Sequence, residues 1–196
     1  MHGVVFAVAM MFDVLISAGH EGRPASCPHF PQHHCNLGAA GERAWTPIVA
    51  DTATRILRAH GVTVARLPAD FDGTYDVNGA AFIHFDGSAP ACDSGASIGY
   101  HHARDVAGAS AWHALYGRYF PFSFRPDNFT DGLRNYYAFR QVKARDVSLV
   151  LELGEITCPA QRAWLSPRLQ WAGAMLAYFL SETIGKGAVP DPGRPP

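Results

Sequence analysis

The chain has 196 residues, of which 48% are hydrophobic and 17% charged, so it can bury a core and cannot be disordered throughout. Sixteen Lys and Arg against 17 Asp and Glu give a formal net charge of -1. Because no basic excess is available to neutralise a phosphate backbone, we expect no nucleic acid partner. Ten histidines favour a metal site without locating one.

The two ends of the chain differ from its middle. An apolar run over residues 3–11 has no Lys or Arg before it and leads into no good cleavage site, so it is a poor signal peptide, and it is too short to span a bilayer. The last residues, 185–196, read GKGAVPDPGRPP, which is typical of a tail or linker. We therefore predict one folded domain over residues 12–184, without a membrane span and monomeric.

Short apolar runs alternate with helix-start signals along this domain. The predicted strands cover residues 12–17, 62–67, 80–85, 136–142 and 147–153. The predicted helices cover residues 46–60, 104–119 and 166–184, the first and last beginning at Thr-Pro and Ser-Pro. This order predicts an α/β fold: a single domain whose mostly parallel, twisted central sheet is flanked by helices on both faces.

Three polar residues occupy positions where sites form in such folds. His20 directly follows the first strand, Glu42 precedes the first helix, and His84 ends the third strand. In open α/β sheets, binding sites form at the carboxyl ends of strands. Two histidines and one glutamate are a common catalytic zinc set that leaves one position for water. Each residue also has a simpler interpretation, as a hydrogen-bonded loop histidine or as a carboxylate favouring a helix N-terminus.

A fourth polar residue, Glu152, lies inside the apolar strand over residues 147–153. A carboxylate in a buried strand is costly unless it is paired or used. It could be a satisfied core group, or it could serve as a general base beside a metal-activated water.

The four cysteines fit no CxxC pair and no zinc-finger spacing, so three disulfide pairings or four free thiols remain open. They are Cys27, Cys35, Cys92 and Cys158. The Cys27–Cys35 segment also holds three histidines, and we expect this loop to border the active site. It could be a second metal site, a loop closed by a disulfide, or a plain His-rich loop.

Four segments in order resemble the zinc-dependent N-acetylmuramoyl-L-alanine amidases named amidase family 3. The segments are residues 18–22 (AGHEG), 38–42 (GAAGE), 81–86 (AFIHFD) and 149–154 (LVLELG). They match the family's Gly-His-Gly, Gly-x-x-Glu, Ser-Ile-His-Ala-Asn and Val-Leu-Val-Glu-x-Gly segments. The resemblance covers about residues 13–184 and extends to the helix-to-strand passage over residues 58–67 (RAHGVTVARL).

This resemblance implies a zinc amidase catalytic domain. His20, Glu42 and His84 would be the zinc ligands, and Glu152 the catalytic carboxylate. The implied reaction is hydrolysis of the amide between N-acetylmuramic acid and L-alanine in peptidoglycan, so the protein would act on the cell wall, as phage lysin catalytic domains do. The alternatives are a related zinc peptidase of the wall, or an inactive wall-binding or regulatory member of the fold.

The sequence departs from the family pattern at several places. Asp86 stands where the family often has Asn, Glu155 replaces a Phe, and Thr157-Cys158 replaces Ser-Asn. Glu155 therefore competes with Glu152 for the role of base. We favour Glu152 by alignment, and we expect Glu155 to lie in the loop after the strand.

Overall fold

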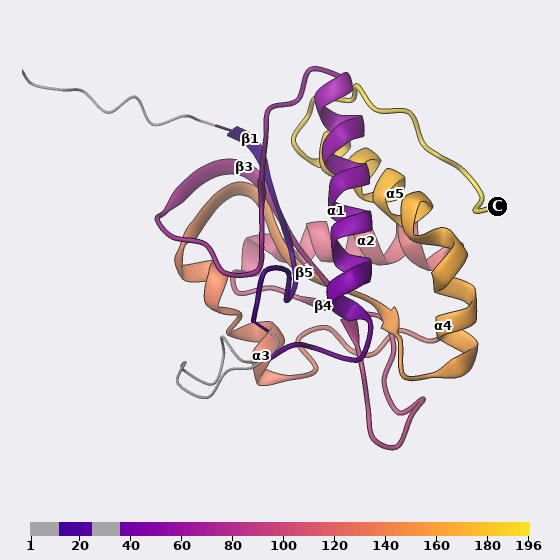
Figure 1. Ribbon diagram of the computed structural model, residues 1–196. Coiled ribbons are helices and arrows are strands. Elements are labelled where there is room, and N and C mark those ends of the chain that lie inside the picture. The colour runs from indigo at the N-terminus through magenta and orange to yellow at the C-terminus, as the bar shows by residue number, and fades with distance from the viewer. Residues whose placement is uncertain (1–11, 25–35) are drawn as a thin grey trace, which may run out of the picture.

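The protein is described by a computed structural model that covers residues 12–24 and 36–196 (Figure 1). Its centre is one five-stranded sheet with the order β2-β1-β3-β5-β4, in which only β4 runs antiparallel to its neighbour. The strands are β1 (Phe12–Ala18), β2 (Val64–Leu67), β3 (Tyr75–Asp86), β4 (Ser97–Gly99) and β5 (Val142–Glu155). The predicted mostly parallel central sheet is confirmed.

The two faces of the sheet carry layers of unequal thickness. The three long helices, α1, α2 and α5, contribute to the large core on one face. The smaller core on the other face is covered by α3, by a short 3-10 helix over Tyr137–Arg140 and by aromatic side chains. The α-helices are α1 (Glu42–Ala59), α2 (Val106–Gly117), α3 (Asp131–Arg134), α4 (Pro159–Leu165) and α5 (Leu169–Thr183), with two further 3-10 turns at Ala103–Asp105 and Ser166–Arg168. Helices therefore flank both faces, as predicted.

The alternation of side chains along β5 explains why this strand is nearly all apolar. Leu149, Leu151 and Leu153 face the large core, whereas Val150 faces the small one. Because both faces of a parallel strand are covered, both sets of side chains leave water. β5 pairs with β3 over most of its length, and this register places Glu152 opposite His84.

Helix α1 begins at Glu42, four residues before the predicted start at Thr46. Gly41 caps it in a left-handed conformation (φ 102°), which a glycine adopts without strain. The Thr46 hydroxyl is no cap but donates to the backbone oxygen of Gly19 at 2.7 Å. Pro47 lies inside the helix, where its missing N–H costs one intrahelical bond near the N-terminus.

The predicted strand over residues 136–142 is wrong. This segment forms the 3-10 helix Tyr137–Arg140, and β5 begins only at Val142. The aromatic residues of this segment pack on the small core, since Tyr136 and Phe139 both lie against the Phe82 ring. The short strand β4 and helix α4 were not predicted.

Residues 185–196 form no helix or strand, yet they contact the domain. The hydroxyl oxygen of Ser181 accepts hydrogen bonds from the amides of Ala188 and Val189, and Val189 is buried. The indole nitrogen of Trp171 donates to the Gly193 carbonyl at 2.9 Å. The domain boundary at residue 184 and the linker role stay predictions. Within the described ranges, no helix is long and apolar enough to cross a membrane.

The close packing of α1 on α5 gives a first prediction. A Cβ at Gly173 would lie 2.7 Å from both Thr52 Cβ and the Val49 carbonyl oxygen. We expect Gly173→Val to lower the free energy of unfolding by about 1–3 kcal/mol, because it forces the helices apart. The matched control is Ala174→Val, which adds a β-branched residue to the same helix at a half-buried position. Equal losses in urea unfolding of the two variants would contradict this explanation.

Candidate metal centre

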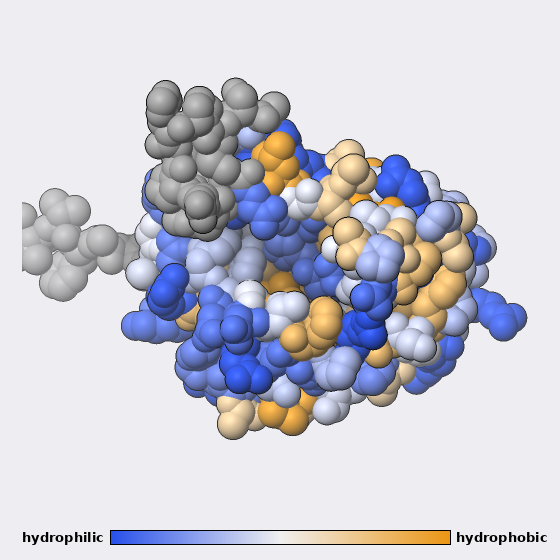
Figure 2. Space-filling view, turned by 90° about the horizontal axis from the view of Figure 1, so that it is seen from below, coloured by the Kyte–Doolittle hydropathy of each residue, from blue (hydrophilic) through white to orange (hydrophobic). Residues whose placement is uncertain are grey.

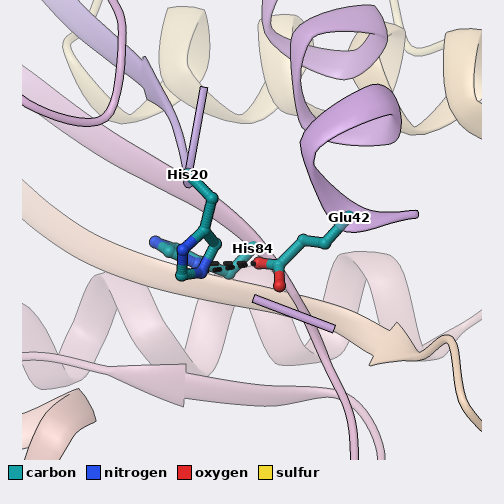
Figure 3. Close-up of side chains that lie close together, drawn as sticks. All are labelled: His20, Glu42 and His84. Carbon is teal, nitrogen blue, oxygen red and sulfur yellow. Dashed lines mark hydrogen bonds and ion pairs between the residues drawn. The ribbon is translucent and has the colours of Figure 1, made fainter. Parts of the chain in front are cut away.

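Three predicted residues converge at the carboxyl ends of the strands (Figure 3). His20 lies in the turn after β1, Glu42 is the first residue of α1, and His84 lies near the end of β3. Their candidate ligand atoms all lie within 4.8 Å of one another, and all three residues are buried. Glu42 Oε1 is 2.9 Å from His84 Nδ1 and 3.4 Å from His20 Nε2. The structure therefore brings the three residues together.

Two glycines leave the space that these side chains occupy. A Cβ at Gly19 would lie 2.4 Å from the His84 ring, and one at Gly38 would lie 2.0 Å from Glu42 Oε2. Gly38 also has a positive φ of 71°. Any larger residue would displace a side chain of the group, so the backbone itself forms a cradle around it.

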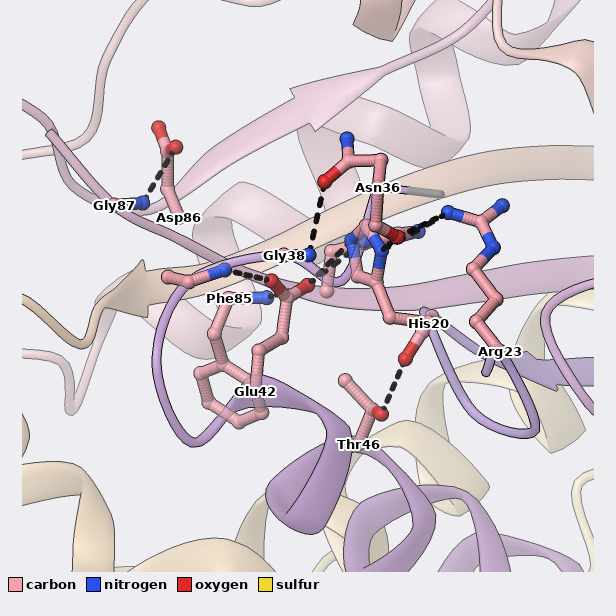
Figure 4. Close-up of polar contacts among 12 residues, drawn as sticks. His20, Arg23, Asn36, Gly38, Glu42, Thr46, Phe85, Asp86 and Gly87 are labelled. Carbon is pink, nitrogen blue, oxygen red and sulfur yellow. Dashed lines mark hydrogen bonds and ion pairs between the residues drawn. The ribbon is translucent and has the colours of Figure 1, made fainter. Parts of the chain in front are cut away.

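The carboxylate of Glu42 is fixed on both oxygens (Figure 4). Oε2 accepts from the Ala39 amide at 3.0 Å, and Oε1 accepts from the Phe85 amide at 3.1 Å. Burial raises the pKa of Glu42, but hydrogen bonds and charge from the two histidines outweigh it and lower the pKa to about 2. Glu42 is therefore an anionic group at neutral pH, positioned for a cation.

The His20 ring is oriented by a backbone carbonyl. Its Nδ1 lies 2.6 Å from the Asn36 carbonyl oxygen and 3.0 Å from Arg23 Nη1, and its Nε2 lies 3.4 Å from Glu42 Oε1. Arg23 donates to the same oxygen at 2.8 Å and forms a two-pronged ion pair with Asp70. Such outer contacts fix the orientation of metal-binding histidines in proteins.

The donor set fits a divalent transition metal. Two imidazoles and one carboxylate are ligands that zinc prefers, and a third histidine or cysteine is not required in a catalytic site. Burial lowers the pKa of His84, although Glu42 partly opposes this, and a neutral imidazole is the form that binds metal. No other group of three such residues was found within the described ranges.

Glu152 lies beside this group. It pairs in register with His84 across β3 and β5, and it lines the same hollow. Its Oε2 atom is buried and has no hydrogen-bond partner among the described residues. Burial raises the pKa of Glu152 well above its ordinary value, and the carboxylates of Glu42 and Asp86 raise it further. An unpartnered carboxylate beside a metal group is suited to receiving a proton.

Glu155 is not in a loop, as we had expected, but is the last residue of β5 and fully buried. Its carboxylate accepts hydrogen bonds from the hydroxyls of Ser88 and Thr157 and from the amides of Cys92 and Ser94. These four contacts hold the segment after β3 against the sheet. Glu155 therefore has a structural role, whereas Glu152 keeps free acceptor capacity.

Two hollows meet at the histidines, on the face where the strands end (Figure 2). One, of about 480 Å³, extends from Glu42 toward Gly87 and Ser88. The other, of about 370 Å³, extends toward Thr130 and Tyr136. Figure 2 shows this face hollowed near its centre, with both hydrophilic and hydrophobic residues on the rim. A larger hollow of about 670 Å³ lies along the outer edge of β2, away from this chemistry.

Solved structures similar to this chain are amidase domains. The catalytic domain of CwlV, an N-acetylmuramoyl-L-alanine amidase from Bacillus (Paenibacillus) polymyxa var. colistinus, has a TM-score of 0.63 and 16% identity, covering 86% of this chain and 96% of that one. The amidase Ami1 from Mycobacterium smegmatis has a TM-score of 0.63 and 16% identity, covering 90% and 97%. The amidase AmiC2 of Nostoc punctiforme has a TM-score of 0.62 and 16% identity, covering 86% and 94%.

The chain has the fold of these amidase domains. No protein-family model matches the sequence, and no curated protein matches it. The amidase fold is thus visible in three dimensions at an identity of 16%. At this identity the likeness establishes the architecture, and the chemistry must be argued from the residues.

A disulfide joins Cys92 to Cys158, across the base of the segment that follows β3 in this amidase fold. It is one of the bonds that the sequence left open. Cys27, Cys35 and the histidines between them fall outside the described residues, so the alternatives for that loop stay predictions.

The residues that support the metal group were not among those predicted from the sequence. Arg23 and Asn36 reach His20, and the Tyr136 hydroxyl lies 3.0 Å from His84 Nε2. Arg23 follows His20 by three residues in one turn, which was a usable signal. Tyr136 had none, because it comes to the site from a segment that we predicted as a strand.

The contacts of Glu155 predict a pH-dependent contribution to stability. Burial raises the pKa of Glu155, but the four hydrogen bonds outweigh it, so the pKa lies below its ordinary value. A carboxylate with a lowered pKa stabilises the fold above its unfolded pKa of about 4.3, and this stabilisation is lost as the pH falls through the folded pKa. We expect Glu155→Gln to lower the free energy of unfolding by about 1.5–3 kcal/mol at pH 7.

The measurement is urea unfolding of both proteins at pH 7 and near pH 3. The difference between them should shrink at the lower pH, where Glu155 in the parent protein becomes protonated. A difference that does not change with pH would show that charge is not involved.

Proposed function

We propose that the protein is a zinc hydrolase of peptidoglycan that cleaves the amide bond between N-acetylmuramic acid and L-alanine. The observation that carries the proposal is the buried His20–Glu42–His84 group, at the end of a sheet with the fold of amidase domains. Glu152 beside this group supplies a candidate base. The proposal includes the identity of the metal and the role of each residue.

His20 Nε2, His84 Nδ1 and the Glu42 carboxylate would hold the metal. When bound, zinc supplies Lewis acidity, which polarises the substrate carbonyl and lowers the pKa of a coordinated water to about 7. Asn36 and Arg23 keep the His20 ring turned toward the site, and the amides of Ala39 and Phe85 keep the Glu42 carboxylate in place. These contacts give the ligands one arrangement before substrate binds.

Glu152 would move the protons. Its raised pKa makes the carboxylate a stronger base than an exposed glutamate, so it can take a proton from the attacking water. The same group, once protonated, can deliver that proton to the nitrogen of the departing L-alanine. The amide C–N bond then breaks to give a lactyl carboxylate and a free amine.

The two hollows on either side of the histidines fit a substrate that extends in two directions. An N-acetylmuramic acid and its stem peptide leave the scissile amide on opposite sides, so each hollow can take one of them. The Cys92–Cys158 disulfide supports action outside a reducing compartment, as expected for a protein that reaches the cell wall.

Removal of a ligand should remove the metal. We expect the parent protein to bind one zinc, and His20→Ala or His84→Ala to weaken zinc affinity by more than about 100-fold, since outer-contact changes alone reach 10–100-fold. Competition with a chromophoric chelator measures the affinity. The control is His113→Ala, an exposed histidine stacked on Phe124 away from the site. Unchanged affinity in both site variants would show that the metal is held elsewhere.

The chemistry is tested by digesting purified peptidoglycan with the zinc-loaded protein and analysing the products by mass spectrometry. We expect stem peptides with a free L-alanine amino group. Glu152→Gln should lower turnover about 10²–10⁴-fold while zinc binding is kept, because the variant cannot accept the proton. Glu155→Gln is the matched comparison on the same strand and should retain turnover below its unfolding temperature.

Other products would select another hypothesis. Cleavage within the stem peptide would indicate a wall peptidase with the same metal group. No product from several wall types, with zinc bound, would indicate a wall-binding or regulatory protein. Loss of turnover in Glu155→Gln but not in Glu152→Gln would reverse the assignment of the base.

A further inference from the structure

The two ring nitrogens of His84 face different surroundings. Nδ1 faces Glu42 Oε1 at 2.9 Å, and Nε2 faces the Tyr136 hydroxyl at 3.0 Å. The centroids of the His84 and Tyr136 rings are 5.4 Å apart, and the two rings are nearly perpendicular, at 80°. Only one ring nitrogen of a neutral histidine carries a proton, so a proton held at Nε2 leaves Nδ1 free to bind a metal.

The Tyr136 hydroxyl belongs to a chain of hydrogen bonds with one direction. Tyr137 donates its hydroxyl to the Ala69 carbonyl oxygen, which can only accept. Tyr136 donates in turn to the Tyr137 oxygen over a long contact of 3.5 Å. With its own proton used there, the Tyr136 oxygen is free to accept a hydrogen bond from a proton held on His84 Nε2. In that tautomer Nδ1 has no proton and can bind a metal, whereas in the other tautomer Nδ1 donates to Glu42 Oε1 at 2.9 Å.

We propose that Tyr136 is a positioning residue that holds His84 in the tautomer with Nδ1 free to bind metal. The inference rests on the metal group of the proposed function and assigns a residue outside the ligand set. With the proton on Nε2, a lone pair of Nδ1 and the Glu42 carboxylate are directed into the same space. A metal cation stabilises that arrangement, and without one the two acceptors oppose each other.

The fold determines where the hydroxyl lies. The Tyr136 ring packs on Phe82 at 5.2 Å and on Tyr137 at 4.6 Å, between the small core and the hollow beside Glu152. Removing the hydroxyl therefore leaves the ring packing intact. This separates the positioning role from a merely structural one.

The same backbone segment supports both histidines. The row of hydrogen bonds that begins at His84 ends at the Ala69 carbonyl oxygen. The next residue, Asp70, forms an ion pair with Arg23. Arg23 donates to the Asn36 carbonyl, which also lies 2.6 Å from His20 Nδ1. Both imidazoles are thus oriented by contacts anchored just after β2, and both face Glu42.

The first measurement uses the ¹⁵N-labelled, zinc-loaded parent protein. Long-range ¹H–¹⁵N NMR of the histidine rings should show a proton on His84 Nε2 and zinc on Nδ1. Zinc on Nε2 would overturn the proposal without any variant. This readout does not depend on catalysis.

The second measurement is the zinc affinity of Tyr136→Phe by chelator competition. We expect it to weaken about 10–100-fold, as for the loss of an outer contact to a ligating histidine. Tyr137→Phe should cause a smaller loss, since Tyr136 can still accept from His84. The control Tyr119→Phe removes a hydroxyl from a ring that packs on Trp171, away from the site, and should not change affinity.

These outcomes separate the inference from the proposed function. Unchanged zinc affinity in Tyr136→Phe, with the same His84 tautomer, overturns the positioning role. An affinity loss in a protein that cleaves no peptidoglycan supports the positioning role and contradicts the amidase proposal. A parent protein that binds no zinc overturns both. Thermal unfolding of the metal-free variant, expected to match the parent, excludes a general loss of structure.

Discussion

The bridging of two histidines by the Glu42 carboxylate is the constraint on which the site depends. Glu42 begins α1, His84 ends β3 and His20 follows β1, so one carboxylate joins three elements at the edge of the sheet. The contact requires α1 to start four residues earlier than its Thr-Pro signal indicates. It also requires glycine at two positions, because a Cβ at Gly19 or Gly38 would occupy the space of the ligands. The same backbone features therefore determine both the path of the chain and the positions of the three polar side chains.

The two glutamates of β5, Glu152 and Glu155, lie on the same strand but differ in their hydrogen-bond partners. Both are acidic residues in an apolar strand, and the sequence does not distinguish them by composition. The structure does so through their partners: Glu155 is saturated by four donors, whereas Glu152 has a buried oxygen with none. A carboxylate whose contacts are complete stabilises the fold, and one whose contacts are incomplete retains the capacity to react.

The sequence predicted the mostly parallel sheet, and the candidate residues that the structure brings together, from local patterns. Apolar runs mark the buried strands, and His20 and His84 lie at their ends, where parallel strands bring side chains to one edge. The Thr-Pro pattern predicted Thr46 as a helix cap. Its hydroxyl instead donates across the fold to the Gly19 carbonyl, a contact that no local pattern indicates. The 136–142 segment was misassigned because its aromatic residues pack on a sheet rather than forming one. Arg23, Asn36 and Tyr136 support the ligands through contacts between distant segments, which no local pattern records.

The candidate ligands lie at positions 20, 42 and 84, and β5 contributes Glu152. No short stretch of the chain contains the set, so an unfolded chain cannot present these atoms together. A metal that binds only the folded state adds RT ln(1 + [metal]/Kd) to the stability, which is about 4 kcal/mol at 1,000 times the Kd. The metal concentration would then affect the fraction of molecules that are folded as well as the fraction that hold the metal. If the proposed function holds, such a protein would be both less active and more easily degraded where its metal is scarce.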